Sequence, residues 1–321
     1  MKKIIFFLIF IFFLLSVGLL VNQFYAKSPN KQFSVVSPLP DFLTIITNKE
    51  VSTLNLWLPS LKNRLSANLQ TPNISAKSAL IFDTTSKTVL YSKSPQQKLP
   101  MASLTKIMTA IVALENTKKD DVSIVQEDDL VGEDSMGLDV GEKLSQSELL
   151  YGMMLHSGND AAEVLANNFP GGRVAFIKAM NNKVKTLGLS DTNFTNPTGL
   201  EGDGKQYTTA YDLVVISEYA LTNFPLFDQI VSTFDYNIPQ TDTHKAFYLE
   251  NETNLLTSYP GVKGIKDGYT PEAGLCLVTY LDYKGHKIIG VVLGSGDRRG
   301  EMIELLDYSL KTLGITPPNH G

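Results

Sequence analysis

The strongest hydrophobic pattern lies near the N-terminus, where an uncharged apolar run extends from Ile4 to Val21 directly after two lysines. As a helix it would be about 27 Å long, close to the ~30 Å hydrocarbon core of a bilayer. A cleaved signal peptide has a shorter apolar region and small residues at the cut, and here bulky Phe24 stands two residues before Ala26. The run therefore predicts export and favours a retained anchor over residues 1–25 that leaves the rest of the chain outside the cytoplasm. Secretion after signal cleavage is the alternative.

The next segment, residues 26–75, is interrupted repeatedly by proline, which prevents long regular elements. We interpret it as a stalk or linker that packs partly on the following domain. Within it, four leucines at helical spacing predict one short amphipathic helix: Leu58, Leu61, Leu65 and Leu69.

From residue 76 to about residue 315 the pattern predicts one α+β domain. Two short apolar runs joined by a polar turn, residues 79–82 and 88–91, predict a β-hairpin. Apolar residues at helical spacing predict helices at 103–115, 145–156, 160–168, 173–187, 210–221 and 298–313. Runs rich in β-branched residues at 274–280 and 286–293 predict a second hairpin, connected through residues 282–285. The order predicts an antiparallel sheet built from both ends of the domain and flanked by helices, with a mainly helical subdomain inserted.

Composition and charge narrow the classes of function. The formal net charge of −5 argues against nucleic acid as the main partner. The only cysteine, Cys276, lies in an apolar run and is expected to be a small core residue. None of the four histidines belongs to a metal-ligand pattern, so we expect neither a metal nor a cofactor.

A serine and a lysine three residues apart, Ser103 and Lys106, form the first chemical pattern. On a helix these side chains share a face, so the lysine amine can reach the serine hydroxyl. A serine hydroxyl becomes a good nucleophile when a base takes its proton, and lysine can be that base if desolvation and neighbouring cations lower its pKa. The pattern alone is weak, because an N-terminal serine and a solvated lysine are common on helices.

Two further patterns follow in the chain. Ser157-Gly158-Asn159 lies between two predicted helices, where a loop can present a hydroxyl and an amide together. Lys266-Asp267-Gly268 lies within residues 264–270, where the edge of a strand could hold a cation beside the serine and pair with an extended peptide. Alone, the former is a helix cap and the latter is a turn.

Taken together and in this order, the three patterns resemble the S-x-x-K, S-x-N and K-T-G signature of serine penicillin-binding proteins. The segment from Met101 to Ala110 is similar to the nucleophile segment of low-molecular-mass D-Ala-D-Ala carboxypeptidases, peptidase family S11. Further segments that fit the family are Ser135–Leu138, Leu149–Ala162, Asn196–Leu200, Tyr207–Leu213 and Gly268–Gly274. The similarity extends over residues 75–313 and implies the penicillin-binding, β-lactamase-like transpeptidase fold.

The resemblance implies a role for each matching residue. Ser103 would attack the carbonyl between the last two D-alanines of a peptidoglycan stem peptide, and Lys106 would act as base. Ser157 would relay the proton to the leaving amine, while Asn159 would hold the peptide. The third motif and its continuation would bind substrate through Lys266, Asp267, Gly268, Tyr269 and Thr270. Backbone N–H groups of Ser103 and Tyr269 would form the oxyanion hole, and β-lactams would acylate Ser103.

One residue departs from the family pattern, because Asp267 stands where threonine is usual. A carboxylate there would repel a substrate carboxylate about 4 Å away by about 1 kcal/mol in water and about 4 kcal/mol at an effective dielectric constant of 20. We therefore expect Asp267 to weaken carboxypeptidase turnover. Asp267 escapes this conflict if it points away, if it is protonated, or if the natural substrate lacks a free carboxylate at that place.

Three alternatives accompany the carboxypeptidase interpretation. A peptidoglycan endopeptidase would use the same residues on cross-links, and a catalytically weak protein would only bind stem peptides or β-lactams. A class A β-lactamase needs a deacylating glutamate after the second motif. The corresponding region, residues 194–200, contains no acid before Glu201, which argues against it.

Overall fold

The computed structural model of the chain describes residues 58–65, 69–116, 120–253 and 255–320. The predicted leader, residues 1–25, lies outside these residues. Within them, no helix is long and apolar enough to span a bilayer.

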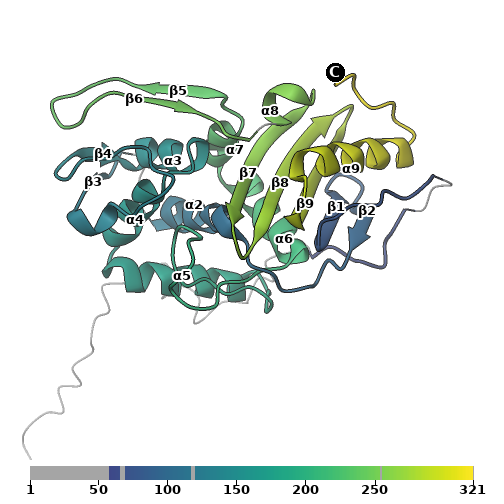
Figure 1. Ribbon diagram of the computed structural model, residues 1–321, viewed down its shortest axis with the longest axis horizontal. Coiled ribbons are helices and arrows are strands. Elements are labelled where there is room, and N and C mark those ends of the chain that lie inside the picture. Colours follow the sequence, from purple (N-terminus) through teal and green to yellow (C-terminus); the bar gives the residue numbers. More distant parts are fainter. Residues whose placement is uncertain (1–57, 66–68, 117–119, 254, 321) are drawn as a thin grey trace, which may run out of the picture. The chain divides into compact units, whose positions relative to one another are not determined.

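A five-stranded antiparallel sheet with strand order β2-β1-β9-β8-β7 organises the domain (Figure 1). Its strands are β1 (Ser78–Asp83), β2 (Thr88–Lys93), β7 (Val262–Thr270), β8 (Gly274–Tyr283) and β9 (His286–Ser295). The first two strands and the last three come from opposite ends of the domain, as predicted. This order makes β7 an edge strand, so one side of its backbone is available to other partners.

Both faces of the sheet are covered by helices. On one face, α9 (Arg298–Thr312) packs on β8 and β9, and Ile81 and Leu277 join the apolar residues of that helix (Figure 1). On the other face, α6 (Ala210–Asn223) packs on β1 and β9, and Leu80 and Val278 belong to the larger core. Successive strand residues thus belong to different cores, as the alternation of side chains along a strand requires.

The chain between β2 and β7 forms the inserted, mainly helical part. Its helices are α2 (Thr105–Asn116), α3 (Gln146–Leu155), α4 (Asn159–Asn167), α5 (Gly172–Thr186), α6, α7 (Pro225–Val231) and α8 (Leu255–Ser258). The same part contains two short 3₁₀ helices: η3 (Ala102–Leu104), which precedes α2, and η4 (Glu127–Asp129), which lies between β3 and β4. Two antiparallel ribbons complete it, β3 (Val122–Ile124) with β4 (Lys143–Ser145) and β5 (Asp235–Ile238) with β6 (Phe247–Glu250).

The predicted α+β class, both hairpins and all six predicted helices are confirmed, with ends within a few residues. Cys276 is fully buried in the larger core, where burial raises the pKa of its thiol to about 11. The second hairpin is tighter than predicted. Tyr283 pairs with His286, so only Lys284 and Gly285 form the loop, both with positive φ as a two-residue hairpin turn favours.

The helix predicted from the leucines at 58, 61, 65 and 69 is wrong for the described part of that stretch, where no residue is helical. Instead, the backbone of Asn63 and Leu65 pairs with Val89 at the edge of β2. Pairing with an exposed strand edge satisfies these backbone groups without a helix, and Pro59 disfavours helix continuation at the start of the stretch. The spacing of these leucines therefore does not reflect helical packing.

Candidate active site

Ser103 lies in the η3 turn that leads directly into α2. Ala102 has φ of 49°, a left-handed conformation that costs a non-glycine residue energy. The Thr105 hydroxyl donates a hydrogen bond of 2.9 Å to the carbonyl of Ala102 and holds this turn. Because this hydrogen bond holds the strained turn, Ser103 is kept in one orientation at the start of the helix.

Lys106 is fully buried, and its Nζ contacts three oxygen atoms. These are Ser103 Oγ at 2.9 Å, Asn159 Oδ1 at 2.7 Å and the Thr198 carbonyl at 3.0 Å. A charged lysine has three N–H donors, but a neutral amine has two and a lone pair. Because the amide and carbonyl oxygens can only accept, the lone pair of the neutral amine is directed at Ser103 Oγ. The geometry suits a base for Ser103.

The pKa of Lys106 is lowered to about 7, first by burial and then by the positive charge of Lys266. The carboxylates of Asp134, Glu252 and Asp267 oppose this effect in part. Since an ordinary lysine has a pKa near 10.4, the neutral amine is much more abundant here at neutral pH. A lysine with this pKa is poised for proton transfer.

The joint between α3 and α4 carries the second motif. Ser157 is buried with φ of 57°, and Asn159 is the first residue of α4. The sharp left-handed turn at Ser157 lets α4 begin directly after α3 ends. Asn159 then reaches Lys106 across 53 positions of the sequence.

Asp160, next to Asn159, anchors the loop above this joint. Its buried carboxylate accepts hydrogen bonds from the backbone N–H groups of Met136 and Leu138, both at 3.0 Å, and of Gly137 at 3.1 Å. The hydroxyl of Ser135 donates to it at 2.5 Å. This segment, Ser135–Leu138, is one of those that indicated the family, and Asp160 gives the physical reason for its place in the fold.

A turn centred on Asn196 presents the carbonyl that Lys106 binds. Asn196 Oδ1 accepts from the N–H groups of Thr198 at 3.2 Å and Gly199 at 2.8 Å. Gly199 has φ of 96°, and a Cβ there would lie 2.0 Å from the Ala102 carbonyl oxygen. Only glycine therefore allows this turn to approach the Ser103 segment.

The edge strand β7 approaches the same segment from another side. A Cβ at Gly268 would lie 2.8 Å from the backbone nitrogen of Ser103. The glycine thus leaves space next to the N–H group that the resemblance assigns to the oxyanion hole. Along the same strand Tyr269 is 61% exposed, and Thr270 is buried at the strand end.

Lys266 and Asp267 occupy opposite faces of β7. Lys266 pairs with Val278 in the larger core, while Asp267 pairs with Leu277 in the core beneath α9. Residues opposite each other in antiparallel strands project to the same face, so Asp267 projects toward α9. It nevertheless remains within the site, because its Oδ1 lies 3.0 Å from Lys266 Nζ.

A second cation binds Asp267 from the first turn of α9. Arg298 contacts Asp267 Oδ2 through Nη2 and donates from Nη1 to the Gly268 carbonyl at 2.9 Å. Burial raises the pKa of the Asp267 carboxyl, but Lys266 and Arg298 outweigh it and leave that pKa below its ordinary value. The suggestion that Asp267 avoids repelling a substrate carboxylate by being protonated is therefore wrong. The group is an ion-paired carboxylate at neutral pH.

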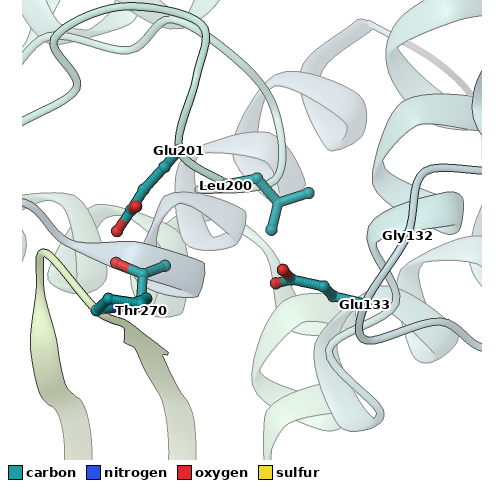
Figure 2. A pocket seen from close by; sticks show the side chains of 6 residues that line it. Gly132, Glu133, Leu200, Glu201 and Thr270 are labelled. Carbon is teal, nitrogen blue, oxygen red and sulfur yellow. The ribbon is translucent and has the colours of Figure 1, made fainter.

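A cavity of about 300 Å³ adjoins the end of β7 and is lined by Gly132, Glu133, Leu200, Glu201, Thr270 and Pro271. Figure 2 shows the Glu201 and Thr270 side chains directed toward one another, with Glu133 on the other side. Glu201 accepts a 2.9 Å hydrogen bond from the backbone N–H of Glu272, and contacts with Thr270 and Glu272 lower its pKa. The cavity thus places two acidic side chains beside the strand expected to bind substrate.

The structure brings Ser103, Lys106 and Asn159 into direct contact and places Gly268 against Ser103. Sequence reasoning missed Arg298 and the Thr198 carbonyl. No side-chain pattern marks Arg298, because its contact with Asp267 joins residues 31 positions apart in the sequence. Among the described residues, no group of three or more His, Cys, Asp or Glu side chains is arranged to hold a metal ion.

Comparison with known proteins agrees with this geometry. A family model described as D-alanyl-D-alanine carboxypeptidase matches residues 66–297. The chain is 35% identical over 252 residues to a D-alanyl-D-alanine carboxypeptidase of Bacillus subtilis, a match that covers 75% of this chain and 64% of that protein. It is also 35% identical over 220 residues to a D-alanyl-D-alanine endopeptidase of Escherichia coli, covering 64% of this chain and 67% of that protein.

A solved structure is similar over its whole length. The crystal structure of a Streptomyces DD-transpeptidase superimposes with a TM-score of 0.72 at 32% sequence identity, covering 76% of this chain and 100% of that chain. This likeness confirms the predicted fold. The chain spans about two thirds of the length of the Bacillus and Escherichia relatives.

Proposed function

We propose that this chain, which belongs to the D-alanyl-D-alanine carboxypeptidase family of serine peptidases, removes the terminal D-alanine from peptidoglycan stem peptides. The observation that carries the proposal is the contact between Ser103 Oγ and the buried, low-pKa amine of Lys106. A serine next to such an amine is an activated nucleophile. A protein that only binds peptides has no need of it.

The proposed reaction has two steps. Ser103 Oγ bonds to the carbonyl carbon of the penultimate D-alanine while Lys106 takes the hydroxyl proton. The C–N bond then breaks, and the leaving amine takes a proton, with Ser157 as the proposed relay. Water hydrolyses the resulting ester, which restores Ser103 and releases the shortened peptide. The Ser103 N–H beside Gly268 supports the developing oxyanion.

D-Alanine release from a synthetic stem pentapeptide tests this function, using a soluble fragment that starts at residue 70. This start keeps Ser75 and Ala76, whose backbone N–H groups bind Glu301. We expect release by the wild-type fragment and a loss of at least about 10³-fold in Ser103→Ala. Equal release by both proteins would refute the assignment of Ser103.

Endopeptidase action on cross-links is the second candidate. The similarity to an Escherichia coli protein of that name and the anionic Asp267 favour it. The nature of the released product separates the two activities, since a carboxypeptidase frees D-alanine and an endopeptidase separates two stem peptides.

We also propose that residues 1–25 anchor the protein in the cell membrane with the catalytic domain outside the cytoplasm. The length and apolarity of the run from Ile4 to Val21 support this. Fractionation of expressing cells tests this proposal. We expect the full chain in the membrane fraction, and a chain that lacks residues 1–25 should be absent from that fraction. Protein recovered in the medium with a new N-terminus would instead indicate a cleaved signal peptide.

A further inference from the structure

We propose that Asp267 is a built-in anion that occupies Lys266 and Arg298, the two cations that would otherwise bind a substrate carboxylate, so that the enzyme prefers peptide bonds whose leaving group carries no free carboxylate. The inference rests on the proposed peptidase function and specifies its substrate class. It concerns this chain in particular, because the family motif carries threonine at this position.

The first observation behind this proposal is that both carboxylate oxygens of Asp267 are ion-paired. Asp267 offers two carboxylate oxygens, and each is bound by a different cation, Lys266 on Oδ1 and Arg298 on Oδ2. The side chains of Lys266 and Asp267 are 1% and 7% exposed, and that of Arg298 is 17% exposed. Pairs this well shielded from water are little screened by salt.

The second ground is the place of these cations relative to the nucleophile. Arg298 also binds the carbonyl of Gly268, the residue that lies against the Ser103 nitrogen. Lys266 lies close enough to Lys106 for its charge to lower the pKa of that base. The two cations therefore lie next to the nucleophile segment and to the strand expected to bind the substrate.

Competition between anions follows from this placement. A substrate carboxylate must take donors from Asp267 or accept its repulsion at short distance, and both reduce what the carboxylate contributes to binding. At about 4 Å the repulsion corresponds to a factor between several-fold and about a thousand-fold, depending on the local dielectric constant. A leaving group without a carboxylate, such as a C-terminal amide or a cross-link through a side-chain amine, meets no such conflict.

The test compares two peptides that differ only at the C-terminus. One is a stem peptide ending in D-Ala-D-Ala with a free carboxylate, and the other is its C-terminal amide. The catalytic efficiency kcat/KM is measured for each from the amine released, with the wild-type protein, Asp267→Thr and Asp267→Asn. The readout is the ratio of the two efficiencies, which partial loss of folded protein leaves unchanged.

We expect the wild type to cleave the amide at least as efficiently as the acid. Both Asp267 variants should shift the ratio at least tenfold toward the acid, mainly through a lower KM for that peptide. Asp282→Asn is the matched control, because Asp282 forms an ion pair with Lys263, which lies at the other end of β7 from Asp267. The ratio of efficiencies for this variant should match that of the wild type.

A wild type that prefers the acid tenfold or more, with a ratio unchanged in both Asp267 variants, would overturn the inference and leave the peptidase function intact. Cleavage of neither peptide by any of the folded proteins would overturn both. The two proposals therefore fail in distinguishable ways.

Discussion

Lys106 is fully buried, and its amine contacts three oxygen atoms. Burial and Lys266 disfavour the ammonium, whereas the carboxylates of Asp134, Glu252 and Asp267 favour it, and the balance places the pKa of Lys106 at about 7. The base is therefore partly neutral under physiological conditions, and its protonation should govern the acylation rate.

This balance predicts the pH dependence of acylation. The neutral fraction of Lys106 grows as pH rises through about 7, so the rate should increase between pH 6 and pH 8 and level off above. Replacing Lys266 with Gln removes a charge that lowers the pKa of Lys106, so the rising limb should move to higher pH. Single-turnover acylation measured at a series of pH values checks both, and a flat profile for the wild type would contradict the role of Lys106 as base.

The contacts of Lys106 with Ser103 and Asn159 were predictable from sequence, because the order and spacing of the three patterns are specific. The role of Arg298 was not predictable, because it arises only from the contacts that this residue, at the start of α9, makes with Asp267 and Gly268 of β7. The Thr198 carbonyl was equally hidden, since a backbone acceptor leaves no trace in side-chain patterns. Tertiary packing decides both.

At the level of elements, two glycines allow close approaches to the η3 turn that carries Ser103, one from the turn at Asn196 and one from strand β7. Gly199 meets the carbonyl of Ala102, and Gly268 meets the nitrogen of Ser103. Any side chain at either position would push on the nucleophile segment. The close approach of β7 to η3 thus depends on the smallest residue.

Gly268→Ala tests this dependence. Its Cβ would lie 2.8 Å from the Ser103 nitrogen, so the strand or the turn must shift and the space for an oxyanion should narrow. We expect kcat to fall by about 10²-fold or more, the scale of losing one oxyanion contact. Gly268 has no positive φ, so the variant should fold, as circular dichroism can verify. Wild-type kcat in a folded variant would show that this approach does not matter for catalysis.

Long periodic elements were predictable, and short ones were not. Helices α2 to α6 carry several turns of apolar spacing, whereas strands β3 to β6 are three or four residues long and have too little alternation to recognise. The erroneous helix around Leu61 has the same origin: a few leucines fit a helical period by chance, and pairing with β2 decides the conformation.

On the scale of the whole molecule, Glu301 connects α9, near the C-terminus, to the segment before β1. Glu301 is buried and accepts hydrogen bonds from the backbone N–H groups of Ser75 and Ala76 and, at 2.6 Å, from the Ser295 hydroxyl. These contacts join three parts of the sequence at one carboxylate. They also link the helix that carries Arg298 to the sheet.

Replacing Glu301 with Ala should leave these donors without their acceptor. We expect the free energy of unfolding to fall by about 2–4 kcal/mol, the cost of leaving buried polar groups unpaired. Glu304→Gln, an exposed change one turn further along α9, is the control and should alter it by less than about 0.5 kcal/mol. Urea denaturation measures both, and equal stabilities would contradict the structural role of Glu301.

Covalent trapping by a β-lactam is the most direct measurement of the central claim that Ser103 is an activated nucleophile. The folded protein is incubated with excess penicillin, and its mass is determined before and after digestion. We predict one adduct, located on the peptide that contains Ser103, absent from Ser103→Ala and slower to form in Lys106→Ala. No adduct on the wild type after prolonged exposure, or the same adduct on Ser103→Ala, would contradict the account.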